Sequence, residues 1–184
     1  MADDTTVVTP VARLSFPQLF KAKKVNPDDA TAKFSATLLF DKKAQKTPEF
    51  KRLQAAVEEA IEEKWGSDRP KKLKLPFLTT EDFDKVPDGY TDDMIIVRTN
   101  TTIQPGVVDR RNQPILDEED IYPGCYVDAA VHAYAWEHRT GGKGVSIGLD
   151  HIRFRKDGEP FRKNSKPTDV FDELPDDEDD DEIW

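Results

Sequence analysis

The sequence predicts a mainly β protein: a small closed or half-closed barrel of about five strands, with one inserted α-helix and an acidic tail. Several segments are rich in β-branched and apolar residues and are separated by turn residues, as in small barrels. Only one stretch has a clear helical periodicity. The third observation is that residues 169–184 contain ten acids and no base.

Charge divides the 184 residues into two parts. The chain has 37 acidic residues against 27 Lys and Arg, a net charge of −10. Removing the ten acids of residues 169–184 leaves 27 acids in residues 1–168, which equals the 27 bases. We therefore expect a neutral folded domain over 1–168 and a disordered acidic tail over 169–184. Because the folded part is neutral, the low isoelectric point does not exclude a polyanionic partner.

The strands are expected where β-branched and apolar residues gather. The first is interrupted by Pro10, which indicates an edge or a bulge. Residues 16–30, with several prolines and a basic cluster, are expected to form a loop, and residues 67–92 an irregular segment. The predicted strands are residues 5–16, 32–41, 93–103, 124–138 and 145–158, with a turn-rich connection over 104–115.

The helix is predicted between Thr47 and Gly66. Thr47 is suited to be its N-cap, Pro48 to be its first residue, and Gly66 to follow its end. Its apolar residues recur at spacings of three and four and form one stripe, which we interpret as core packing and not as a binding groove: Phe50, Leu53, Val57, Ile61 and Trp65.

Cysteine content and the N-terminus both favour the cytoplasm. Cys125 is the only cysteine, so an intramolecular disulfide is excluded. The chain begins without a basic, apolar leader, and no run approaches the roughly 20 apolar residues of a membrane span. We expect no membrane association.

Residues 124–138 form the segment with the most informative pattern. Read with a period of two, the odd positions are small and apolar, as the interior of a tightly curved barrel requires. The even positions place Tyr126, Tyr134 and Trp136 in a row on the other face. Two interpretations stay open: the rings are a second core beneath the helix or another subunit, or they form a platform on which unpaired bases stack.

The stacking interpretation is favoured by cations expected near these rings. A base stacked on an aromatic ring contributes about 1–3 kcal/mol whatever its identity, so this pattern predicts binding without sequence preference. The cations are Arg139 and Lys143 in the adjoining loop, Arg98 on the preceding strand, and Arg153 and Arg155 on the following strand.

Catalytic and metal sites find no support in the sequence. Cys125 lies on the opposite face from His132 and His138, and no pair of residues has zinc-ligand spacing. Phosphate-binding loops, nucleophile elbows and dinucleotide fingerprints are absent. A Mg²⁺-dependent nuclease would need carboxylates that converge from separate strands, and here the acids lie in loops, on the helix and in the tail. We expect no enzyme, no metal and no cofactor.

The order of the segments resembles the single-stranded DNA-binding proteins of tailed bacteriophages. The resemblance covers roughly residues 10–160, with the aromatic-terminated acidic tail as a further shared feature. Its most specific parts are "YPGCYVDAAVHAYAW" and "KGVSIGLDHI"; the others are "RLSFPQLFKAKK", "AKFSATLLFDK", "EEKWG" and "PGVVDRRNQPILDEED". The basic stretches "RPKKLK" and "RKNSK" match no family position.

The resemblance implies an OB-fold, here a five-stranded Greek-key barrel, that coats single-stranded DNA during phage replication, recombination or repair. It adds Lys21, Lys23, Lys24, Arg110 and Arg111 as expected strand contacts. It also implies a location in the cytoplasm of an infected bacterial host. A homo-oligomer is left open.

The acidic tail is expected to have two roles under this resemblance. Its carboxylates imitate a nucleic-acid backbone and compete with DNA, and its end contacts phage or host replication proteins. The expected partner-binding residues are Asp179, Asp180, Asp181, Glu182, Ile183 and Trp184. The alternative functions are a protein-interaction module, or an acidic chaperone that binds no nucleic acid.

Overall fold

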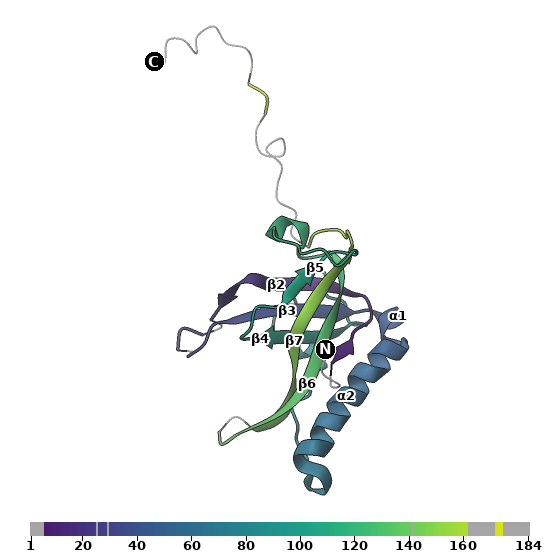
Figure 1. Ribbon diagram of the computed structural model, residues 1–184, viewed down its shortest axis with the longest axis vertical. Coiled ribbons are helices and arrows are strands. Elements are labelled where there is room, and N and C mark those ends of the chain that lie inside the picture. Colours follow the sequence, from purple (N-terminus) through teal and green to yellow (C-terminus); the bar gives the residue numbers. More distant parts are fainter. Residues whose placement is uncertain (1–5, 25, 29, 141, 162–171, 175–184) are drawn as a thin grey trace.

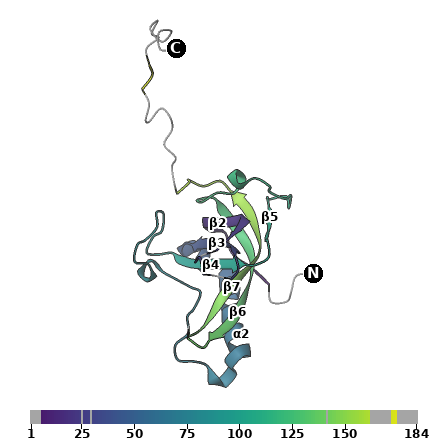
Figure 2. The ribbon, with the colours of Figure 1, turned by 90° about the vertical axis from the view of Figure 1, so that its left-hand side faces the viewer.

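The protein is described here by a computed structural model that covers residues 6–24, 26–28, 30–140, 142–161 and 172–174. A strongly curved sheet forms the body, a long helix lies along one side, and the β6–β7 hairpin crosses the other strands (Figures 1 and 2). The strands are β1 Val7–Val8, β2 Ala12–Lys23, β3 Lys33–Phe40, β4 Ile95–Thr101, β5 Gly106–Val108, β6 Tyr126–His138 and β7 Gly142–Lys156. The helices are α1 Lys42–Gln45 and α2 Pro48–Trp65, with three short 3₁₀ helices at Gly66–Asp68, Thr80–Asp82 and Glu118–Asp120.

Five of the strands close into a barrel. The sheet order is β1-β6-β2-β3-β4-β7-β5, and the additional pairing of β6 with β7 completes the ring. Neighbouring strands are antiparallel, except that β4 and β5 both run parallel to β7. β1 and β5 extend the sheet beyond the ring at β6 and β7. The predicted mainly β, OB-fold-like barrel with an inserted helix is confirmed.

β2 is longer than predicted. Residues 16–23 were expected to be part of a loop because of Pro17 and the lysines that follow, yet they continue β2 alongside β3. The register shifts between Ser15 and Gln18, and Phe16 has a φ of 45°. Pro17 is accommodated because it lies in this bulge, where a ladder hydrogen bond is already missing. The prediction of a loop from residue 16 was wrong.

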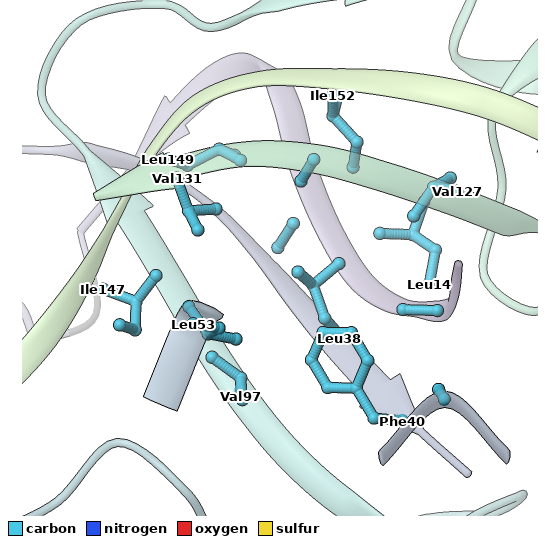
Figure 3. Close-up of a cluster of buried hydrophobic side chains, with 14 of the residues drawn as sticks. Leu14, Leu38, Phe40, Leu53, Val97, Val127, Val131, Ile147, Leu149 and Ile152 are labelled. Atoms are coloured by element: carbon cyan, nitrogen blue, oxygen red, sulfur yellow. The ribbon is translucent and has the colours of Figure 1, made fainter. Parts of the chain in front are cut away.

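The interior of the barrel is apolar and continuous with the buried stripe of α2. Phe50, Leu53, Val57 and Ile61 of the helix are each at most 2% exposed. Figure 3 shows Leu53 among side chains from β2, β3, β4, β6 and β7. The rings of Phe40 and Phe50 meet edge to face at 5.3 Å. Thr47 caps the helix as predicted, because its Oγ1 accepts from the amide of Phe50 at 3.2 Å.

A second, smaller hydrophobic cluster covers part of the outer face of β3 and β4. It is built on Leu39 and Ile96, and the irregular segment 67–92 supplies Phe83 and Tyr90 to it. Burial raises the pKa of Tyr90, whose hydroxyl donates to Ser15 Oγ at 2.9 Å. The predicted irregular segment is thus a cover for the barrel, held in place by aromatic packing.

Residues 157–161 pack on the side of the barrel that carries the second cluster, which the sequence did not indicate. The ring of Phe161 packs on the second cluster, and the guanidinium of Arg13 lies 4.2 Å from its centroid. Arg13 also donates to the carbonyls of Gly124 and Glu159. The core therefore extends past residue 158, where the sequence signal fades. The predicted disordered tail, 169–184, lies almost wholly outside the described residues.

Among the described residues, no helix combines the length and the apolar character that crossing a membrane would require.

Candidate nucleic-acid interface

The alternation predicted for β6 is confirmed by the burial of its side chains. Val127, Ala129 and Val131 are at most 2% exposed and belong to the core. Tyr126, Tyr134 and Trp136 lie on the outer face, and the two hydrophobic clusters of the described residues include none of these rings. Within those residues the rings therefore do not form a second core beneath the helix.

Tyr134 and Trp136 lie near the free end of the β6–β7 hairpin. Tyr134 is 37% exposed, and its hydroxyl donates to Oδ1 of Asn100 at 3.4 Å. Trp136 donates from Nε1 to Ser146 Oγ at 2.9 Å, which fixes the plane of the indole against β7. Lys74 Nζ lies 5.9 Å from the Trp136 centroid, and the ring of His138 is 5.1 Å away.

Two glycines of β7 allow rings from β6 to lie close against the sheet. A methyl group at position 144 would come within 2.6 Å of both the Lys74 carbonyl oxygen and the Trp136 ring. A methyl group at position 148 would overlap the ring of His132. The absence of side chains at Gly144 and Gly148 thus lets the aromatic end of the face remain flat.

The outer face continues from these rings across the barrel through small and polar side chains. Register partners connect His132 of β6 to Gly148 of β7, Gly148 to Asn100 of β4, Asn100 to Ser35 of β3, and Ser35 to Gln18 of β2. We refer to His132, Gly148, Asn100, Ser35 and Gln18 as the outer row. The small residues Gly148, Ser35 and Asn100 in the middle of this row leave a surface that a flexible polymer can cross.

A groove of about 910 Å³ opens at the β6 end of the outer row. Tyr134 and His132 form one wall, Asn100 and the residues that follow β4 form another, and Lys33 contributes a cation. His132 Nδ1 lies 3.0 Å from the Asp150 carboxylate, so an acid is also present in the groove. The groove is mixed in charge, and the aromatic wall is its distinctive feature.

Arg98 occupies the middle of the outer face. It is exposed on β4, and its guanidinium lies over Phe83 at 4.9 Å from the centroid. The aromatic contact holds the guanidinium flat against the protein, and no hydrogen bond to another described residue occupies its N–H groups, which can turn toward an anion. The structure therefore places the predicted cation Arg98 beside the outer row, where Phe83 of the irregular segment holds it.

Arg153 and Arg155 bind a buried acid. The Asp128 carboxylate is 6% exposed and accepts from Arg153 Nε at 2.9 Å, Arg153 Nη2 at 2.5 Å and Arg155 Nη1 at 3.0 Å. These hydrogen bonds raise the pKa of Arg153. The two arginines and the acid together carry one net positive charge, less than the two expected from the sequence.

Tyr126 is separated from the other two rings of the predicted row. Asp128, Ala130 and His132 intervene along β6, and the Tyr126 ring lies between two cations, Lys156 Nζ at 4.7 Å and Arg13 at 6.0 Å. These neighbours are the last residue of β7 and the arginine that anchors the segment 157–161. The row expected from the sequence is thus divided between the two ends of β6.

The remaining predicted cations also fall into two groups. Lys21, Lys23 and Lys24 are exposed where β2 ends, and Lys23 is the register partner of Lys33. Arg139 is exposed at the tip of the β6–β7 hairpin, which projects from the same side of the barrel as the β2–β3 connection (Figure 1). Lys143 pairs with Glu137 at 3.1 Å and lowers the pKa of that acid.

Arg110 and Arg111 belong to the other group. They follow β5, which pairs with β7 at Arg153, in a turn held by Asp109 Oδ1, which accepts from the amide of Arg111 at 2.8 Å. This turn lies at the end of β7 remote from Trp136. The structure thus gathers Tyr134, Trp136, Arg98, Arg139 and the β2 lysines toward one side, and Tyr126, Arg110, Arg111, Arg153 and Arg155 toward the other.

No group of three or more potential metal ligands exists among the described residues. Cys125 is fully buried, and burial raises the pKa of its thiol to about 11. Such a thiol stays protonated near neutral pH and is a poor metal ligand.

Comparison with known proteins identifies the family. The family model described as "Enterobacter phage Enc34, ssDNA-binding protein" matches residues 5–183. The chain belongs to this family. A relative from Acyrthosiphon pisum secondary endosymbiont phage 1, named "Putative protein p50", is 31% identical over 157 residues, or 81% of this chain and 82% of the relative.

Solved structures of phage proteins share the fold of this member of the Enc34 family. The single-stranded DNA-binding protein of bacteriophage Enc34, solved in complex with ssDNA, superposes with a TM-score of 0.72 at 22% identity, covering 86% of this chain and 90% of that one. The gp2.5 protein of bacteriophage T7, also a single-stranded DNA-binding protein, superposes with a TM-score of 0.63 at 13% identity, covering 95% and 100%. Members of this family are non-enzymatic binders.

Several residues of the interface in this Enc34-family chain were missed by the sequence analysis. Gln18 was assigned to a loop, and Ser35 and Asn100 are small polar residues without a motif of their own. Alternation within β3 and β4 would have placed Ser35 and Asn100 outward, but only the register between strands aligns them with Gly148. Lys33 and Phe83 are likewise brought to the face by tertiary structure alone.

Proposed function

We propose that this protein coats single-stranded DNA without reading its sequence, and that the strand lies along the outer row. The observation that carries the proposal is the pair Tyr134 and Trp136, which stand outside both hydrophobic clusters beside the groove and within the same face as Arg98. Aromatic faces accept any base, and cations beside them neutralise the backbone.

The cations at the two sides of the face would contact phosphates. Lys21, Lys23, Lys24 and Arg139 are exposed on the side of the β2–β3 connection and the hairpin tip, so a strand on the outer row would pass between them. Arg98 would contact the strand midway. Arg110, Arg111, Arg153 and Arg155 would be reached only by a longer strand that also passes Tyr126.

Salt dependence tests the electrostatic part of the proposal. We expect the affinity for oligo-dT to fall between about 50 mM and about 200 mM salt, with a log–log slope of about −0.7 for each phosphate neutralised. Titration of a labelled oligo-dT followed by fluorescence anisotropy measures the slope. Oligo-dA of equal length is the control for sequence independence. Absence of binding at the lower salt would favour a protein-interaction module instead.

We also propose that the acidic residues 169–184 compete with DNA, and that Asp179–Asp181, Glu182, Ile183 and Trp184 contact replication proteins of the phage or the host. Ten carboxylates in this segment match the charge of a short nucleic-acid strand. The preceding residues 157–161 are anchored through Phe161 and Arg13, so the acids are tethered to the barrel.

Removal of residues 169–184 is expected to raise the affinity for oligo-dT at low salt, with a smaller gain at high salt because the competition is electrostatic. A variant with the acids of this segment replaced by Asn and Gln is the matched control for length. Equal affinities of the intact and shortened chains at low salt would contradict the competition. Roles in replication, recombination or repair follow from the same proposal and need assays with the phage enzymes.

A further inference from the structure

Phe16 is an exposed aromatic ring at the β2 end of the outer row, and core packing does not explain it. Phe16 is 61% exposed, and neither hydrophobic cluster of the described residues includes it. Its φ of 45° lies in the left-handed region, which is unfavourable for a bulky residue and is further disfavoured by the proline that follows. The fold thus combines a strained backbone with an apolar ring exposed to water at this position.

Phe16 adjoins the outer row directly. The bulge that contains it lies between Ser15, which pairs with Thr37, and Gln18, which pairs with Ser35 of the outer row. A groove of about 320 Å³ lies at the ring, formed by residues 16–21 of β2 and by Glu118, Ile121 and Pro123. Lys21, exposed at this groove, supplies a cation within the same stretch of β2.

We infer that Phe16 is a second base-stacking position, at the end of the DNA path remote from Tyr134 and Trp136. This inference rests on the proposed function and specifies where the DNA strand leaves the barrel. A strained residue that persists in a folded protein points to a functional constraint. An exposed ring with a lysine on the same groove is a combination suited to a nucleobase and its phosphate.

The distance between the two aromatic positions agrees with one continuous DNA strand that contacts both. From β6 the outer row crosses β7, β4 and β3 before it reaches β2. Four steps of about 4.8 Å between neighbouring strands give about 19 Å along the surface. At the stacked spacing of about 3.4 Å this distance corresponds to roughly six nucleotides, within the range of about 4–16 for one OB fold.

Phe16→Gly and Phe16→Trp test the inference in the full-length chain. Glycine accepts a positive φ, so Phe16→Gly removes the ring without adding backbone strain, and its thermal midpoint should equal or exceed that of the wild type. We expect this variant to bind oligo-dT of about twelve nucleotides about 5-fold to 150-fold more weakly, the factor that corresponds to one lost stack. Phe16→Trp should retain the wild-type affinity.

Oligonucleotide length separates this inference from the proposed function. With oligo-dT of about three nucleotides, too short to join the two ends, Phe16→Gly should bind as the wild type does while Trp136→Ala still binds more weakly. Photocrosslinking with 5-iodouracil should attach DNA to the peptide that contains residue 16. If Trp136→Ala weakens binding but Phe16→Gly leaves the affinity for the longer strand unchanged, the second stacking position is wrong and the proposed function stands. If the wild type binds neither oligonucleotide, the proposed function itself fails.

Discussion

Replacing Tyr134 and Trp136 together by alanine is expected to weaken binding of oligo-dT by about 2–6 kcal/mol, since each lost stack removes about 1–3 kcal/mol. The fold should tolerate the change because neither ring belongs to a hydrophobic cluster. Trp136 loses one hydrogen bond, to Ser146, and Tyr134 loses one to Asn100, and both partners can then bind water. Fluorescence anisotropy measures the affinity, and circular dichroism at rising temperature measures the stability.

Tyr126→Ala is the matched control for the double variant. It removes an outward aromatic ring from the same strand, but that ring lies between Lys156 and Arg13. We expect this variant to lose stability and to keep most of its affinity for a short strand. A loss of affinity as large as that of Tyr134→Ala would instead mean that DNA follows the whole length of β6. A double variant that binds like the wild type would remove the stacking platform from the mechanism.

Replacing Asp128 by asparagine is expected to lower the free energy of unfolding by about 3 kcal/mol. The carboxylate is 6% exposed and accepts three hydrogen bonds from Arg153 and Arg155. Hydrogen bonds to charged groups contribute about 1.5–3 kcal/mol each, and the arginines recover part of the loss because they are 38% and 40% exposed and can turn to water. Urea denaturation followed by fluorescence measures the change.

Asp150→Asn provides the comparison for that experiment. Asp150 also contacts a side chain on the neighbouring strand, His132 at 3.0 Å, but the Asp150 side chain is 31% exposed. Exposed pairs contribute about 0–1 kcal/mol, so this variant should unfold close to the wild type. Equal effects of the two substitutions would show that burial of Asp128 does not control the strength of its ion pairs.

The elements predicted correctly are those whose signals lie within a single segment of the sequence. α2 was found because its capping residue and apolar stripe lie within one segment, and β6 because alternation has a period of two residues. β2 was shortened because its prolines and basic cluster suggest a loop, and only pairing with β3 reveals that Phe16 and Pro17 form a bulge in a continuing strand.

The composition of the site depended on contacts between distant segments. Whether Arg153 faces DNA or Asp128 is decided by the register of β6 against β7, which shifts between Ala130 and Val131. Phe83 and Phe161 come from segments without periodicity, and their packing on Leu39 and Ile96 follows from the completed barrel. Sequence alone could identify the proposed stacking residues as exposed aromatics but could not identify which cations already had a partner.

Pairing of β6 with the N-terminal strands has a consequence for how the protein folds. The hydrogen bond from Ala129 to Thr9 Oγ1 joins residues 120 positions apart, and the one from Arg13 to Gly124 joins residues 111 apart. Contacts between residues so far apart form only after a large loop has closed, and closing it costs chain entropy before the contacts stabilise the fold. Folding is therefore expected to be slow for a chain of this size. Until β6 and β7 have left the ribosome, the edges of β2 and β4 have no partners, and the nascent chain is exposed to misassociation.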